Sequence, residues 1–130
     1  MDCPDCGHEA LAFPVPAELR DALPGEEPGA ALCTHCLALH PVGDPPADQP
    51  EFQRVSDAFP TNPDAAVPMA LLVGLLSNLA LYRAEISDLL ARVERAGTDP
   101  LLVLDRLARD PAIESEHDLS GRRTQLEQLL

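Results

Sequence analysis

CPDCG at residues 3–7 and CTHC at residues 33–36 decide the fold of this chain, because they hold its only four cysteines. Each Cys-x-x-Cys turn can direct two thiolates toward one cation, and two such turns supply the four tetrahedral ligands of a structural zinc site. The residues between the pairs leave room for short strands that carry the turns toward each other. We therefore predict a small N-terminal β zinc ribbon over residues 1–43, with one Zn²⁺ held by Cys3, Cys6, Cys33 and Cys36.

Other uses of the four cysteines fit the sequence less well. A rubredoxin-like iron site would want a glycine after the second pair and several aromatic residues, but this chain has Leu37 there and few aromatics. A redox dithiol would need one pair beside a βαβ pattern, which the sequence lacks. Four thiolates leave no vacant position for water, which disfavours catalytic zinc. Iron and disulfide bonds stay open as lesser alternatives.

Three of the four histidines flank or interrupt the cysteine pairs: His8, His35 and His40. Each could donate a hydrogen bond to a sulfur from outside the ligand set, or replace a cysteine as fourth ligand. With four cysteines present, we favour exposed polar side chains. His117 stands alone in a polar segment and carries no signal.

The composition is acidic and free of lysine. The 130 residues carry a net charge of −13, and all nine basic residues are arginine. Such a balance is typical of proteins that stay hydrated in molar salt, where the Debye length falls to about 3 Å. A salt-loving archaeon is the favoured source, and a GC-rich mesophile is the alternative.

Nucleic-acid binding is disfavoured by the charge of the ribbon. Residues 1–43 contain seven acidic residues and only Arg20 as a base. Phosphate contacts depend on Lys and Arg side chains that displace counterions. A nucleic-acid partner is therefore the less favoured interpretation.

Residues 44–63 are rich in proline and acidic residues, which is typical of a linker. Phe52, Val55 and Phe59 stand at helical spacing within it. We predict a short helix near residues 51–59 that docks the linker onto a neighbour; a recognition peptide is the alternative. The predicted domains are thus the ribbon at 1–43, the linker at 44–63 and a helical module at 64–130.

One long helix is predicted from Asp64 to Ala96, with Gly97 as its terminating residue. Before Tyr82 it is apolar on nearly every side, so every side must be covered. A homodimer through residues 69–82 and cover by the chain's own ribbon and 51–59 segment are the two alternatives. The apolar stretch is shorter than the ~20 residues that cross a bilayer, so we predict no membrane span.

Two shorter helices are predicted to follow, the first beginning at Pro100 and the second running from Gly121 to Leu130. The last one would face the bundle through Leu126, Leu129 and Leu130. Four arginines gather in this part of the chain: Arg106, Arg109, Arg122 and Arg123. Salt bridges between helices are favoured over a patch for a phosphate-bearing partner.

The cysteine motifs resemble those of zinc ribbons, and the whole chain resembles a small haloarchaeal family of CPxCG-type zinc-finger proteins of unassigned function. The resemblance implies a metal site at the four cysteines and no particular activity. The sequence has no glycine-rich phosphate loop and no nucleophile with a partner base. We therefore expect a cytoplasmic, non-enzymatic adaptor or scaffold with an unidentified protein partner. A transcription- or RNA-associated zinc-ribbon factor is the alternative.

Overall fold

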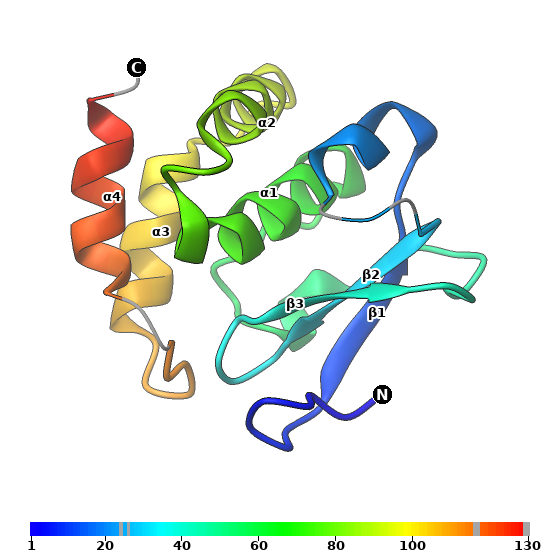
Figure 1. The fold of residues 1–130 in the computed structure, drawn as a ribbon. Helices are drawn as coiled ribbons and strands as arrows, with labels where there is room; N and C mark the ends of the chain where they lie inside the picture. The colour runs from blue at the N-terminus through cyan, green and yellow to red at the C-terminus, as the bar shows by residue number, and fades with distance from the viewer. Residues whose placement is uncertain (24, 26, 116–117, 129–130) are drawn as a thin grey trace.

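The computed structural model describes residues 1–23, 25, 27–115 and 118–128, which form an α+β fold (Figure 1). The strands come first: β1 (Ala10–Pro14), β2 (Gly29–Cys33) and β3 (Leu39–Val42). The helices follow: α1 (Pro63–Leu75), α2 (Arg83–Arg95), α3 (Pro100–Arg109) and α4 (Leu119–Glu127). Short 3-10 segments join them: η1 (Ala17–Ala22), η2 (Phe52–Arg54) and η3 (Leu76–Asn78). The predicted class, a cysteine-bearing β ribbon followed by helices, is confirmed. The predictions for His117, Leu129 and Leu130 lie outside the described residues.

The sheet is antiparallel in the order β1-β2-β3, and its two faces differ in side-chain size. Side chains alternate along a strand, so the pairing of Leu11 with Leu32, and of Leu32 with Leu39, gathers leucines on one face. Ala31 lies opposite Ala12 and His40 on the other face. The leucine face joins the main core, whereas the alanine face joins a small cluster that contains the cysteines.

Helix α1 is buried between the sheet and α2 (Figure 1). Every residue from Ala65 to Val73 is buried, which explains why this stretch is apolar on all sides. Met69 and Leu76 are fully buried within the chain, whereas Leu81 is 72 % exposed. Intramolecular cover thus accounts for residues 69–76. The homodimer through residues 69–82 stays a prediction, and the exposed residues of that stretch are Ser77, Asn78, Ala80 and Leu81.

The helix predicted from Asp64 to Ala96 is interrupted, and this is a correction. The longest helical run ends at Asn78, whose carbonyl accepts hydrogen bonds from the N–H groups of Leu81 and Tyr82. The chain then turns, and α2 begins at Arg83. The turn brings α2 back against α1, where it buries Ile86, Leu89, Leu90 and Val93. A straight helix would have left that apolar stripe without a partner.

The predicted linker packs onto the core at several points. Within the range 51–59, where a short helix is predicted, it forms the short 3-10 helix η2, and Phe52 and Phe59 are both buried. The Ser56 hydroxyl donates a hydrogen bond to Asp110 Oδ2 at 2.6 Å, which ties the segment to the end of α3. Side chains of the ribbon, linker and helices share one core cluster. The predicted domain division stays a prediction. Among the described residues, no helix has the length and apolarity that a membrane crossing requires.

Gly74 marks a close approach between α1 and β3. A Cβ atom there would lie 2.4 Å from Leu39 Cβ and 2.9 Å from Leu39 Cγ. Alanine exceeds glycine in helix propensity by about 1 kcal/mol, yet overpacking costs about 1–3 kcal/mol. We expect Gly74→Ala to lower the free energy of unfolding, measured by chemical denaturation. In a Leu39→Gly background the same change should be neutral or stabilising; equal destabilisation in both backgrounds would show that the contact is not the cause.

Candidate metal centre

The first cysteine pair lies in a tight turn before β1. The Cys3 N–H donates to the His8 carbonyl at 2.7 Å, and the Gly7 N–H donates to the Cys3 carbonyl at 2.9 Å. Gly7 has φ +80°, a conformation that glycine adopts at little cost. An isolated bridge between Asp2 and Glu9 closes the base of the turn. The backbone thus holds Cys3 and Cys6 on one side of the turn, as the motif predicts.

The second pair begins at Cys33, the last residue of β2, and continues into the turn toward β3, where the backbone has the same left-handed step. Leu37 has φ +64°, where the first turn has glycine. A left-handed conformation costs a non-glycine residue roughly 1–2 kcal/mol. Burial of its side chain in the main core, with 2 % exposure, offsets this cost. The leucine therefore anchors the cysteine turn to the helices, a role that the sequence pattern does not reveal.

The two turns bring the four sulfur atoms together. Cys3 Sγ lies 3.8 Å from Cys36 Sγ, and Cys6 Sγ lies 3.4 Å from Cys33 Sγ. All four lie within 4.8 Å of one another. With metal–sulfur bonds of ~2.3 Å, a tetrahedral site has sulfur–sulfur edges of ~3.8 Å. The cysteines are free thiols, and this spacing fits four ligands around one ion.

Hydrogen bonds to sulfur lower the pKa of two of the thiols, Cys3 and Cys33. Burial raises the pKa of Cys33, but the N–H groups of Cys36 and His35, each 3.4 Å from its sulfur, outweigh burial and lower the pKa. Burial also opposes ionisation of Cys3, yet a hydrogen bond from His40 and backbone N–H groups hold its pKa below the usual value. These contacts stabilise the thiolate form, which is the form that binds a metal.

The other two thiols resist ionisation. Burial raises the pKa of Cys36 far above its usual value, and the neighbouring sulfurs add to the rise. For Cys6, the backbone N–H of His8 lowers the pKa, but burial and Cys33 more than offset this. Four thiolates this close repel one another. A bound cation would remove that penalty and release protons.

The three nearby histidines occupy different places. His40 Nε2 lies 3.5 Å from Cys3 Sγ and 3.8 Å from Asp5 Oδ2. His35 instead stacks on His8, with ring centroids 3.9 Å apart. Its Nδ1 lies 3.1 Å from the Ala112 carbonyl oxygen and its Nε2 lies 3.3 Å from Glu114 Oε2, which docks the second turn onto the loop after α3.

Asp5, within the first motif, is a residue that the sequence interpretation overlooked. Its place two residues after Cys3 is the signal that could have identified it, because this spacing puts a carboxylate and a thiolate on one turn. Cys3, Asp5 and His40 offer ligand atoms within 4.8 Å of one another.

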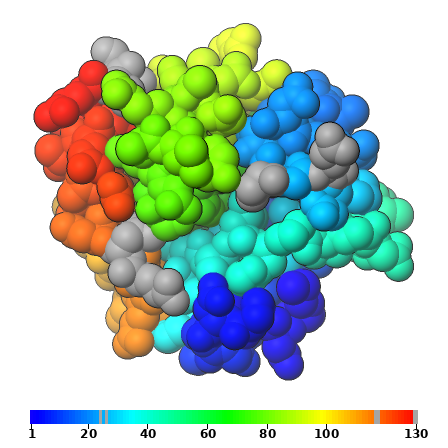
Figure 2. Space-filling model, in the orientation of Figure 1, coloured from blue at the N-terminus to red at the C-terminus, as the bar shows by residue number. Residues whose placement is uncertain are grey.

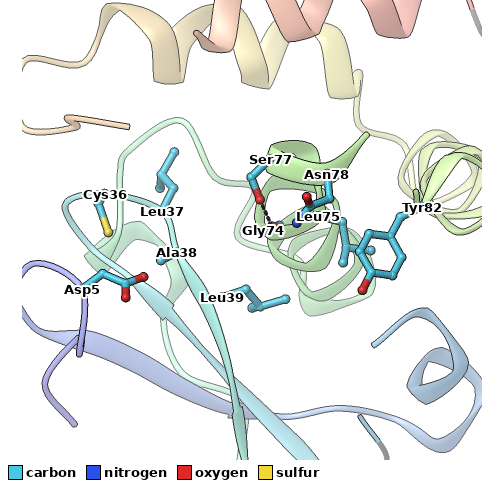
Figure 3. A pocket seen from close by; sticks show the side chains of 10 residues that line it. All are labelled: Asp5, Cys36, Leu37, Ala38, Leu39, Gly74, Leu75, Ser77, Asn78 and Tyr82. Carbon is cyan, nitrogen blue, oxygen red and sulfur yellow. Dashed lines mark hydrogen bonds between the residues drawn. The ribbon is translucent and has the colours of Figure 1, made fainter. Parts of the chain in front are cut away.

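A cavity of about 410 Å³ adjoins the centre (Figure 3). Its walls come from the second cysteine turn and the end of the long helical run, and its polar side chains are Asp5, Ser77, Asn78 and Tyr82. Figure 2 shows the N-terminal turn at the lower edge of the molecule, below β3. The cavity lies where the ribbon meets the helices, because residues of both parts line it.

Three of the four arginines in the cluster predicted near the C-terminus form contacts within the chain: Arg106, Arg122 and Arg123. Arg123 pairs with Asp105 at 2.6 Å and also with Glu127. Arg122 Nη1 donates to Gln125 Oε1 at 3.0 Å. Arg106 Nη2 donates to the Asp57 carbonyl at 3.3 Å. The Arg123–Asp105 pair is a salt bridge between helices of the predicted kind, whereas the contacts of Arg122 and Arg106 are hydrogen bonds, and any bound partner stays a prediction.

Comparison with known proteins places the chain in a family without assigning an activity. A family model described as "Family of unknown function (DUF6276)" matches residues 2–130. No curated protein and no solved structure matches the chain.

Proposed function

This chain belongs to the DUF6276 family of unknown function, and from its cysteine centre we propose that it is a non-enzymatic adaptor built around one structural Zn²⁺. Cys3, Cys6, Cys33 and Cys36 are the ligands in this proposal. The observation that supports it most is the spacing of the four sulfurs, whose measured edges of 3.4 and 3.8 Å lie near those of a tetrahedral thiolate site.

Four thiolates favour zinc and a structural role. Soft sulfur ligands in a tetrahedral set suit zinc or iron, and the choice of zinc rests on the sequence pattern and the scarcity of aromatic residues. An ion with four protein ligands has no vacant position for water or substrate. The centre would then hold the two cysteine turns together and present the surface around them to a partner.

The acidic surface supports the further parts of the proposal. A net charge of −13 without lysine fits a cytoplasmic protein of a haloarchaeon, and it fits the proposed CPxCG-type family. It also favours a protein partner over nucleic acid, because the ribbon has almost no cationic side chains. A transcription- or RNA-associated factor is the second candidate, supported by the zinc-ribbon motif alone.

Metal analysis of the purified chain tests the centre. We expect about one tightly bound zinc per chain, released when a thiol reagent modifies the cysteines, because four thiolates would be the only ligands of that ion. Iron, or no metal under reducing conditions, would contradict the proposal. Protein purified from a matched culture grown with excess iron is the control for adventitious metal loading.

A pull-down at native salt, with and without nuclease, tests the adaptor role. Protein partners that persist after nuclease treatment are the expected result. Partners that depend on nucleic acid would favour the second candidate instead. The Cys33→Ser variant should lose partners that recognise the zinc-bound turns.

A further inference from the structure

We propose that Cys3, Asp5 and His40 form a second divalent-cation site, joined to the four-cysteine centre through the Cys3 sulfur as a bridging ligand. This inference rests on the centre proposed above, because Cys3 belongs to both ligand sets. The second ion belongs to the zinc class, since a thiolate, an imidazole and a carboxylate together suit a borderline cation.

The distances fit coordination by one ion. Metal–sulfur and metal–nitrogen bonds of ~2.3 and ~2.05 Å give a tetrahedral sulfur–nitrogen edge of ~3.5 Å. The measured distance between Cys3 Sγ and His40 Nε2 is 3.5 Å. The nitrogen–oxygen edge of such a site would be ~3.4 Å. His40 Nε2 lies 3.8 Å from Asp5 Oδ2. The Asp5 side chain is 46 % exposed, so it can move the ~0.4 Å that would bring its oxygen to the distance expected for a shared ion.

The fold brings the three side chains together from separate segments. Cys3 and Asp5 share the first cysteine turn, whereas His40 stands on β3, opposite Ala31 on the small-residue face of the sheet. Ala31 has a small side chain, and His40 Nε2 comes within 3.5 Å of Cys3 Sγ. The His40 side chain is 17 % exposed, so it is held largely by packing.

The charges favour a cation at this place. Four thiolates around one divalent ion carry a net charge of −2, and Asp5 adds another negative charge beside them. A second divalent ion reduces this excess, and a thiolate sulfur has lone pairs for two metals. Three protein ligands leave one position for water, so we expect the second ion to bind more weakly than the first.

Titration of the full-length apo protein with Co²⁺ tests the proposal under reducing conditions. The first equivalent should give the absorption of a tetrahedral four-thiolate site. The second should add a distinct band from mixed sulfur, nitrogen and oxygen ligands. His40→Ala should keep the first binding event and lower the affinity for the second ion by at least about tenfold. Mutating a residue that only hydrogen-bonds to a metal ligand already costs about that much affinity. Asp5→Asn, at a more exposed position, should weaken the second event in the same direction.

His8→Ala is the matched control, because the exposed His8 ring stacks on His35 and does not belong to the group of Cys3, Asp5 and His40. It should preserve both events. A single equivalent in the wild type would overturn the second site, as would a second equivalent that persists in His40→Ala. Weaker binding of the first ion alone in His40→Ala would assign His40 as a hydrogen-bond donor to Cys3 and overturn the proposal. Absence of the four-thiolate spectrum would instead overturn the proposed centre.

Discussion

Cys33→Ser is expected to abolish tight metal binding and to remove several kcal/mol from the free energy of unfolding. Cys33 is fully buried, accepts two backbone N–H groups and lies 3.4 Å from the sulfur of Cys6. A structural zinc ion contributes roughly 10–16 kcal/mol to folding of small zinc domains, which is comparable to the ~5–15 kcal/mol net stability of a whole domain. Thermal unfolding and hydrogen exchange, with and without a chelator, measure the loss.

The effect should be greatest at the two cysteine turns. Residues 1–9 and 33–38 contribute few large apolar side chains to the main core apart from Leu37. Their amides should therefore exchange first when the metal is removed. Ala10→Ser is the matched control, since Ala10 is buried in the same cluster and the change adds a hydroxyl without removing a ligand. Chelator-treated protein that keeps full protection in both turns would contradict a structural metal.

Phe13→Ala is expected to cost about 3–5 kcal/mol, the range for removing a buried aromatic side chain. Phe13 is fully buried on β1, and its ring meets Phe52 edge to face at 5.2 Å between centroids. The ring centroid of Phe52 lies 6.2 Å from that of Phe59. The three phenylalanines connect the ribbon to the predicted linker, so their loss should weaken the whole fold rather than the ribbon alone.

Two probes can test whether the fold unfolds as one unit. The chain has no tryptophan and one tyrosine, Tyr82, so tyrosine fluorescence reports on the helical part. The Co²⁺–thiolate absorption reports on the ribbon. We expect the two transitions to coincide and to shift together in Phe13→Ala. Leu102→Ala, at a side chain 55 % exposed, should shift neither by more than about 0.5 kcal/mol. Separate transitions would instead support independent domains.

Local motifs predicted the ribbon well, because the requirements of a cysteine turn are local. Two Cys-x-x-Cys pairs and Gly7 are enough to predict the paired turns, and the structure brings their four sulfurs together. Leu37 shows the limit of such reasoning. A leucine with positive φ is unfavourable in isolation, and only the core that receives its side chain accounts for it.

The helical part shows the same limit over a longer range. The apolar periodicity from Asp64 to Ala96 predicts one helix, and no proline interrupts that stretch after Pro68. The interruption after Asn78 has a tertiary reason, since it lets α2 pack against α1 and bury both apolar surfaces. The break at residues 79–82 thus follows from packing rather than from helix propensity.

The amino-acid sequence by itself determined the fold class, the order of ribbon and helices, and the four cysteines that come together. These features depend on residue type and on short spacings, both of which can be read directly from the sequence. Only the tertiary structure decided that the apolar helix is covered within one molecule, that Leu37 anchors a cysteine turn, and that His40 and Asp5 meet at Cys3. Such features arise from side chains that are far apart in sequence, and their contacts form only when strand register and helix packing have placed them.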